Sequence, residues 1–65
     1  MDATILANRL KDLRADKTQK EVSEAIGLNQ STYAMYESGQ RIPSDENKVK
    51  IADYFERTVQ EIFFD

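Results

Sequence analysis

Apolar residues recur along this chain at the spacing of helix faces. The first set stands at i, i+4 and i+7, positions that line up on one side of a helix: Leu6, Leu10 and Leu13. We expect this helix to run from about Ala3 to Ala15. Four further sets predict four more helices, with inward residues Val22, Ala25 and Ile26, then Tyr33 and Tyr36, then Val49, Ile51, Ala52 and Phe55, then Val59, Ile62 and Phe63.

Capping residues mark where these helices begin and end. Thr18 to Glu21 and Thr58 to Glu61 both read Thr-x-x-Glu, a capping box in which the threonine hydroxyl and the glutamate carboxylate each accept a backbone N–H. Asn29 and Ser44 are suitable N-terminal caps for the third and fourth helices. Two glycines can take the left-handed conformation that ends the second and third helices: Gly27 and Gly39.

The short connection between the second and third helices predicts a helix-turn-helix over about residues 18–39. Such a unit needs a small residue where the helices approach, which is Ser23, and a turn former, which is Gly27. Its apolar packing positions are filled by Val22, Ile26, Leu28, Tyr33 and Tyr36. Residues 1–65 are therefore predicted to form one all-α domain of five helices, in which the tyrosines are core residues rather than a stacking platform for bases.

Composition narrows the class of function. The 65 residues carry 40% hydrophobic and 32% charged side chains, as in a small globular domain with little room for a cofactor cavity. Cysteine and histidine are both absent, which removes disulfides, the usual zinc sites and imidazole catalysis. We therefore expect neither an enzyme nor a cofactor. No basic leader or membrane-spanning segment is visible, so a cytoplasmic location is expected.

The distribution of charge is more informative than its sum. A net charge of -3 argues against a simple polyanion binder. Residues 1–33 hold five acids and five bases, whereas the rest hold seven acids and four bases. The balanced first half can still present a basic face to DNA. Four cations there are candidates for diffuse attraction, although each also fits an ordinary solvated position: Arg9, Lys11, Lys17 and Lys20.

Motifs along nearly the whole chain resemble the helix-turn-helix family of the phage lambda repressor and Cro. They are Leu10-Lys11-Asp12-Leu13-Arg14, Thr18-Gln19-Lys20-Glu21-Val22, Ile26-Gly27-Leu28, Ser31-Thr32-Tyr33, Tyr36-Glu37-Ser38-Gly39, Pro43-Ser44, Ile51-Ala52-Asp53-Tyr54-Phe55 and Glu61-Ile62-Phe63. The resemblance implies a lambda-repressor-like fold and a homodimeric regulator, in the simplest case a repressor, that binds double-stranded DNA sequence-specifically.

The chain departs from the family pattern in two regions. The family usually has two more residues, typically including glycine, between Arg14 and Gln19, so the second helix is expected to start at a shifted angle. Glu56 and Arg57 stand where the family usually has Gly-Val. Asp45 and Lys48 replace leucines that normally pack in the fourth helix. We expect these changes to affect the packing of the last two helices more than the helix-turn-helix.

DNA contacts are expected around the third helix. Gln19 resembles the family glutamine that touches a phosphate beside a helix N-terminus, although an ordinary surface role also fits. The outward face of the third helix supplies the residues that can reach base edges, namely Gln30, Ser31, Ala34 and Met35. Asn29 and Thr32 beside them are also expected to contact DNA. Gln30 can pair with adenine, whereas Ala34 and Met35 offer apolar contact to a thymine methyl or, for Met35, packing. Arg41, and more weakly Gln40, are expected at the phosphate backbone.

Three further residues are expected to have structural roles, two within the chain and one in a dimer. The resemblance implies that Arg14 and Glu37 form a structural ion pair. Phe64 is left over after its neighbours fill the inward positions, so we expect it to be exposed in the monomer and buried in a homodimer. A second function class stays open, an antitoxin or anti-repressor module that binds another protein, because the second half of the chain is acidic and ends in Phe63-Phe64.

Overall fold

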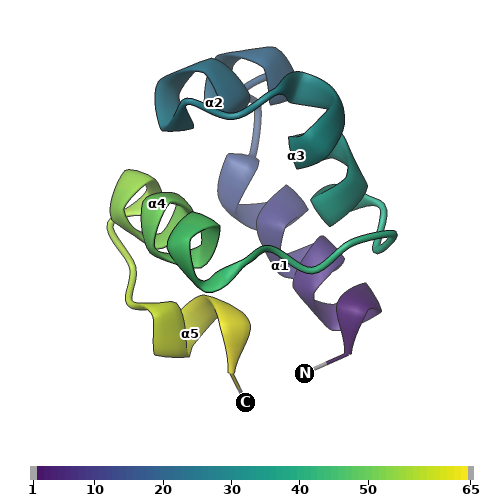
Figure 1. Cartoon of the computed structure of the whole chain (residues 1–65), viewed down its shortest axis with the longest axis vertical. Coiled ribbons are helices and arrows are strands. Elements are labelled where there is room, and N and C mark those ends of the chain that lie inside the picture. Colours follow the sequence, from purple (N-terminus) through teal and green to yellow (C-terminus); the bar gives the residue numbers. More distant parts are fainter. Residues whose placement is uncertain (1, 65) are drawn as a thin grey trace.

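The computed structural model describes residues 2–64, and these residues form five α-helices without a strand (Figure 1). The helices are α1 Ala3–Arg14, α2 Gln19–Ile26, α3 Gln30–Glu37, α4 Asp45–Phe55 and α5 Val59–Phe63. Helix α1 packs against α3 and α5, while α2 packs against α3 and α4. The all-α class and the five helices predicted from the sequence are confirmed.

Each helix begins directly after a residue whose side chain accepts a hydrogen bond from its first turn. These caps are Asp2, Thr18, Asn29, Ser44 and Thr58. The box at Thr58 is complete, because Glu61 Oε1 also accepts the Thr58 N–H at 2.9 Å. The box predicted at Thr18 is only half formed within residues 2–64: its hydroxyl accepts the Glu21 N–H at 3.0 Å, but the exposed Glu21 carboxylate stays in solvent.

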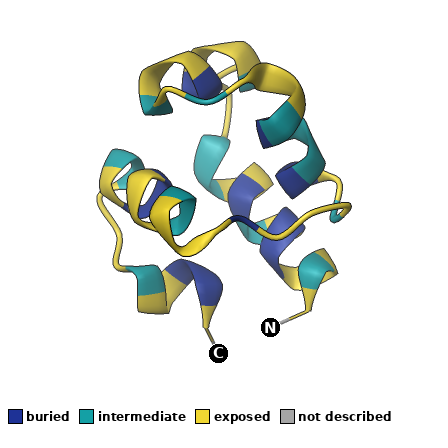
Figure 2. Ribbon diagram, viewed as in Figure 1, coloured by how far each residue is buried: buried dark blue, intermediate teal, exposed yellow. Residues whose placement is uncertain are grey.

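One hydrophobic core joins all five helices (Figure 2). Its buried members are Leu6, Leu10, Val22, Tyr33, Tyr36, Ile51, Ala52, Ile62 and Phe63. The rings of Tyr33 and Tyr36 meet edge to face, with centroids 6.5 Å apart. The tyrosines are thus core residues, as expected. Ala25 was expected to face inward and is exposed, because α2 buries Val22 and Ser23 instead.

The inner face of α4 differs from the prediction by one position. Val49 was expected in the core but is 51% exposed. The inward row is Lys48, Ile51, Ala52 and Phe55, at the i, i+3, i+4, i+7 spacing of a helix face. The Lys48 ammonium lies 5.8 Å from the ring centroid of Phe63 and 5.7 Å from that of Phe64. An apolar pattern misses such a lysine, whose aliphatic stem packs while its charge reaches the surface.

The short connection between α1 and α2 holds Ala15 in a strained conformation. Ala15 has φ 54° and ψ -123°, in the left-handed half of backbone space that favours glycine. The turn around it is closed twice, by the Lys17 N–H donating to the Arg14 carbonyl at 3.1 Å and by Arg14 Nη1 donating to the Lys17 carbonyl at 2.6 Å. The short connection is thus held by two hydrogen bonds and contains one alanine in a conformation that favours glycine.

We expect Ala15→Gly to raise the free energy of unfolding by about 1 kcal/mol, because relief of the backbone strain exceeds the entropy that glycine adds to the unfolded chain. Urea unfolding measures the change. Ala25→Gly is the matched control, since Ala25 is exposed inside α2 and the same substitution there should lower stability by about 1 kcal/mol. A loss of stability in both variants would contradict the strain at Ala15.

Candidate nucleic-acid interface

Helices α2 and α3 form a compact helix-turn-helix, and Gly27 sets the turn between them. Gly27 has φ 83° and ψ 28°, the left-handed conformation predicted for it. The following N–H, of Leu28, donates back to the Ser23 carbonyl at 2.8 Å. Ser23 is 1% exposed, which suits a small residue at the point of closest approach. Asn29 then caps α3, and Figure 1 shows that α2 and α3 run in different directions.

The outward face of α3 carries the residues expected to read bases. Gln30 and Ser31 are exposed, and one turn later Ala34 and Met35 are half-buried. Thr32 is also half-buried, and the opposite face of the helix is buried in the core. The Gln30 side chain makes no hydrogen bond within residues 2–64, so its amide is available for the two hydrogen bonds that adenine offers.

Asn29 and Ser31 are tied together at the start of α3. Asn29 Oδ1 accepts the Ser31 N–H at 2.8 Å and also the Ser31 hydroxyl. The hydroxyl thereby donates its only hydrogen inside the protein. Toward a base, Ser31 can then act only as an acceptor, while the NH₂ group of Asn29 remains a donor.

The loop after α3 folds back onto the helix that precedes it. Gly39 has φ 79°, and the N–H groups of Gln40 and Arg41 both donate to the Met35 carbonyl, at 3.0 and 3.3 Å. Gln40 and Arg41 are exposed, and Arg41 forms no ion pair with any residue from 2 to 64. This geometry holds a free guanidinium beside the end of α3.

Arg14, Gln19 and Glu37 meet where α1, α2 and α3 come together. Glu37 is 1% exposed. Arg14 Nε donates to Glu37 Oε2 at 2.7 Å and Arg14 Nη2 to Oε1 at 3.0 Å, so the pair is bidentate. Gln19 Nε2 also donates to Oε1, at 3.1 Å. The structure thus brings Arg14 and Glu37 together and adds Gln19, whose bond to Glu37 no sequence pattern predicts.

The pKa values in this cluster follow from burial and hydrogen bonding. Burial acts to raise the pKa of Glu37, but the hydrogen bonds from Arg14, the proximity of the Tyr33 hydroxyl and the hydrogen bond from the Gln19 amide outweigh it and hold that pKa below its ordinary value. The hydrogen bond to Glu37 raises the pKa of Arg14. The buried Tyr33 hydroxyl has no hydrogen bond of standard geometry, and burial followed by the neighbouring carboxylate raises its pKa.

We expect acid to weaken the fold through Glu37. Its pKa in the folded protein lies below the ordinary value of 4.5, so its contribution to stability is complete above that pH and is lost as the pH falls through the lower folded value. The free energy of unfolding should therefore fall more steeply between about pH 5 and pH 3 in the wild-type protein than in Glu37→Gln, because only the former titrates at this position. Parallel pH profiles of the two proteins would show that titration of Glu37 contributes nothing to the loss of stability in acid.

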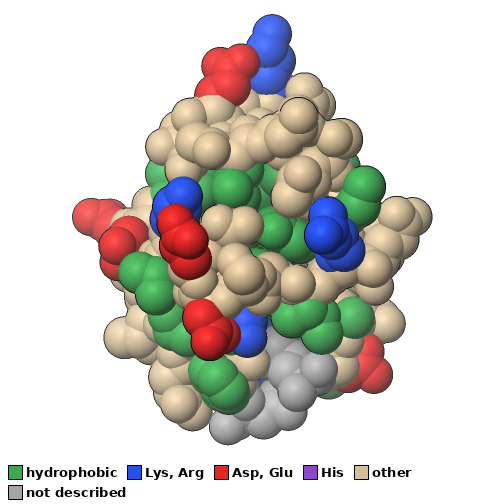
Figure 3. Space-filling model, in the orientation of Figure 1, with side chains coloured by type: hydrophobic (Ala, Val, Ile, Leu, Met, Phe, Trp, Pro, Cys, Tyr) green, Lys and Arg blue, Asp and Glu red, His purple; other side chains and the backbone are tan. Residues whose placement is uncertain are grey.

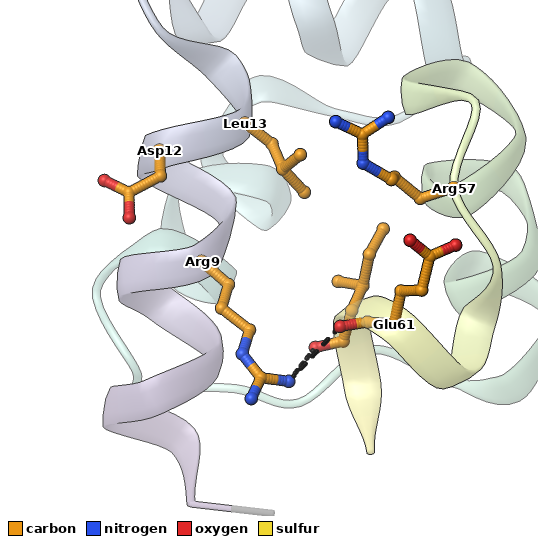
Figure 4. Close-up of a pocket in the computed structure, with 6 residues that line it drawn as sticks. Arg9, Asp12, Leu13, Arg57 and Glu61 are labelled. Carbon is orange, nitrogen blue, oxygen red and sulfur yellow. Dashed lines mark hydrogen bonds between the residues drawn. The ribbon is translucent and has the colours of Figure 1, made fainter. Parts of the chain in front are cut away.

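Two cations expected to attract DNA contact other parts of the protein instead. Arg9 Nη1 donates to the carbonyls of Glu61, Ile62 and Phe64, at 3.4, 3.1 and 3.2 Å, at the C-terminal end of α5. Figure 4 shows Arg9 pointing to the backbone of Glu61 and Ile62. Lys17 Nζ donates to Tyr54 Oη at 3.2 Å and lies 5.0 Å from the centroid of that ring. Lys11 and Lys20 are exposed. On the face drawn in Figure 3, acidic and basic side chains are interspersed with apolar ones.

Two hollows lie away from α3. One, of about 260 Å³, lies between α1 and α5 (Figure 4) and is lined by Arg9, Asp12, Leu13, Arg57, Glu61 and Ile62. The other, of about 130 Å³, we call the C-terminal groove; it is lined by Leu6, Ile42, Lys48, Phe63 and Phe64. Phe64 is 50% and Ile42 is 54% exposed, so this groove is bordered by uncovered apolar surface.

The described residues carry no signs of two other kinds of site. No group of three or more metal-ligating side chains within residues 2–64 is arranged to hold a metal ion. In the same range, every helix is too short or too polar to cross a membrane.

Comparisons with known proteins agree with this geometry. A helix-turn-helix family profile matches residues 9–62. The chain is 42% identical over 57 residues to the cryptic phage CTXphi transcriptional repressor RstR of Vibrio cholerae serotype O1, covering 88% of the chain and 49% of RstR. A second Vibrio cholerae RstR is 30% identical over 63 residues, covering 94% of the chain and 57% of that protein.

A relative from a second bacterium has a similar identity and coverage. The HTH-type transcriptional regulator AnsR of Bacillus subtilis is 40% identical over 57 residues, covering 85% of the chain and 49% of AnsR. The chain spans about half the length of these curated relatives. No solved structure gives a significant match. The profile match, the relatives and the five-helix geometry together establish that the chain belongs to the lambda-repressor-like helix-turn-helix family of DNA-binding transcriptional regulators.

Proposed function

We propose that this chain is the DNA-binding part of a transcriptional repressor that reads its operator in the major groove with α3. The observation that carries the proposal is the outward face of α3, where Gln30 has an uncommitted amide and the neighbouring loop holds a free Arg41. Two of the relatives are named as repressors, which favours repression over activation. The function involves no catalytic step, and its bacterial relatives favour the cytoplasm as its location.

The residues around α3 divide into two groups by role. Base readout falls to Gln30 as a two-bond partner of adenine, to Ser31 as an acceptor, and to Ala34 and Met35 as apolar contacts to thymine methyl groups. Asn29 and Thr32 flank this row. Contacts to the phosphate backbone come from Gln19 at the start of α2 and from Gln40 and Arg41 after α3; these contacts fix the register of the protein on DNA.

Two copies of the chain bind one operator in this proposal. The C-terminal groove, with its half-exposed Phe64, is the proposed dimer interface. A two-fold dimer places its two α3 helices about 34 Å apart, one turn of B-DNA, so the operator is an inverted repeat with half-sites roughly ten base pairs apart.

Selection from a randomised duplex library tests the proposal. We expect enrichment of an inverted repeat with the half-site spacing of one helical turn. A library from which no sequence is enriched would contradict sequence-specific DNA binding and favour the antitoxin or anti-repressor alternative, for which the exposed C-terminal groove provides a binding surface.

Arg41→Ala should weaken binding to all sequences by a similar factor, because a phosphate contact carries no base information. It should also reduce the slope of log affinity against log salt concentration by about 0.9. Titrations at several salt concentrations measure both effects. Arg57→Ala is the control, since it removes the same charge from the connection between α4 and α5, where no DNA contact is proposed. A changed preference at a single base pair in Arg41→Ala would assign Arg41 to base readout instead.

A further inference from the structure

Glu37 makes one contact that its ion pair with Arg14 does not explain, the bond from the Gln19 amide. We propose that Glu37 is a positioning residue for DNA binding, because it fixes the side-chain amide of Gln19 in the single orientation that can serve a phosphate. The inference rests on the proposed function, in which Gln19 contacts the DNA backbone.

The orientation of the Gln19 amide follows from the chemistry of its partner. A carboxylate can only accept hydrogen bonds, so the Gln19 NH₂ group must face Glu37 and the amide oxygen must point away. The opposite orientation would place an oxygen at the Nε2 position, 3.1 Å from Glu37 Oε1 and without a hydrogen between them. Because Glu37 is 1% exposed, little water is present to relieve that repulsion.

This orientation matters because a phosphate is also only an acceptor. The Gln19 NH₂ group has two hydrogens, and Glu37 takes one of them, which leaves the second as a donor at the start of α2. Backbone N–H groups in the first turn of α2 lack helical partners and add further donors there. With the amide reversed, its oxygen would repel the phosphate. Glu37 therefore selects the orientation that DNA needs.

Arg14 makes this arrangement rigid before DNA arrives. It holds both oxygens of Glu37 and, through Nη1, also the Lys17 carbonyl at 2.6 Å, in the turn that leads into α2. The carboxylate that orients Gln19 is thus fixed to the backbone just before Gln19. A side chain ordered in advance loses less entropy on binding.

A double-mutant cycle on DNA affinity tests the inference, with a mixed-sequence duplex about two helical turns long as the probe. We expect Gln19→Ala to weaken binding about tenfold, the effect of losing one hydrogen bond to a charged group. Glu37→Gln keeps the size of the side chain but permits either amide orientation. It should weaken binding several-fold in the otherwise wild-type chain and less than about twofold in the Gln19→Ala background.

Equal fold-losses from Glu37→Gln in both backgrounds would overturn the positioning role, since a purely structural effect does not depend on Gln19. Failure of the wild-type protein both to bind this duplex and to enrich any sequence from the randomised library would overturn the proposed function and this inference together. Circular dichroism at the binding temperature confirms that each variant is folded.

A second measurement needs neither DNA nor a variant. Hydrogen exchange of the Gln19 side-chain amide should be slower than that of Gln30, which is exposed and forms no hydrogen bond within residues 2–64. Equal exchange rates at the two glutamines would overturn the inference even if Glu37→Gln failed to fold.

Discussion

Replacing Glu37 with alanine should lower the free energy of unfolding by about 3 kcal/mol, because it leaves the Arg14 guanidinium without its carboxylate partner and creates a cavity beside it. Glu37 is 1% and the Arg14 side chain 23% exposed, so the pair is largely removed from water. Domains have about 0.05 to 0.15 kcal/mol of stability per residue, or about 3 to 10 kcal/mol for 65 residues, so a loss of this size removes between about a third and nearly all of the stability. Urea unfolding of Glu37→Ala, Arg14→Ala and the double variant measures the effect.

These three variants and the wild-type protein form a double-mutant cycle, which separates the interaction energy of Arg14 and Glu37 from the stability that each substitution costs by itself. We expect a coupling energy of about 2 kcal/mol, since the double variant leaves no charge unpaired. Glu46→Ala is the control, because its contact with Lys50 at 3.6 Å is exposed and its loss should change stability by less than about 0.5 kcal/mol. A coupling energy of zero would mean that Arg14 and Glu37 contribute independently.

If two chains pair through the C-terminal groove as proposed, Phe64→Glu should abolish dimerisation while the helical fold stays intact. Phe64 is 50% exposed in the single chain, so a carboxylate can occupy its position in solvent, but burial of that charge opposes closing an interface. Loss of a central aromatic contact of about 2 kcal/mol or more weakens a dimer at least about 30-fold. Sedimentation measures the oligomeric state, and operator titration measures the accompanying loss of affinity.

Two variants serve as controls for the interface. Val49→Glu introduces the same charge at a residue that is 51% exposed and does not line the C-terminal groove, and it should leave the dimer unchanged. Gln30→Ala should also remain dimeric, while relaxing the preference at one symmetric base pair by about 1 to 3 kcal/mol. If Phe64→Glu stays dimeric with unchanged operator affinity, the interface lies elsewhere on the molecule.

The helix boundaries could be predicted because their signals are local. Thr18, Asn29, Ser44 and Thr58 each accept an N–H two or three residues further along, so the capping sequence contains both partners. The positive φ of Ala15 could not be predicted in this way, because alanine does not favour that conformation. The positive φ of Glu56 had one signal, since Glu56 caps α4 at a position where the family usually has glycine.

In the candidate site, too, features with a local sequence signal could be predicted and contacts between distant residues could not. The outward position of Gln30 follows from the helical period once Tyr33 and Tyr36 are assigned to the core. The bond from Gln19 to Glu37 joins residues 18 apart on different helices, and no periodic pattern reports it. Lys48 illustrates a missed signal: it stands at a position where the family usually has leucine, which already indicated an inward side chain.

The hydrogen bonds from Arg9 to the end of α5 have a consequence for how this helix forms. Helix α5 has five residues, far too few to persist alone, and Arg9 meets its last carbonyls from 52 to 55 positions earlier in the chain. Helix α5 therefore depends on tertiary packing, part of it against its neighbour α4 and part of it, across a long stretch of chain, against α1. Opening of the last turn of α5 breaks the hydrogen bonds from Arg9, so the order of this turn is coupled to its contact with α1.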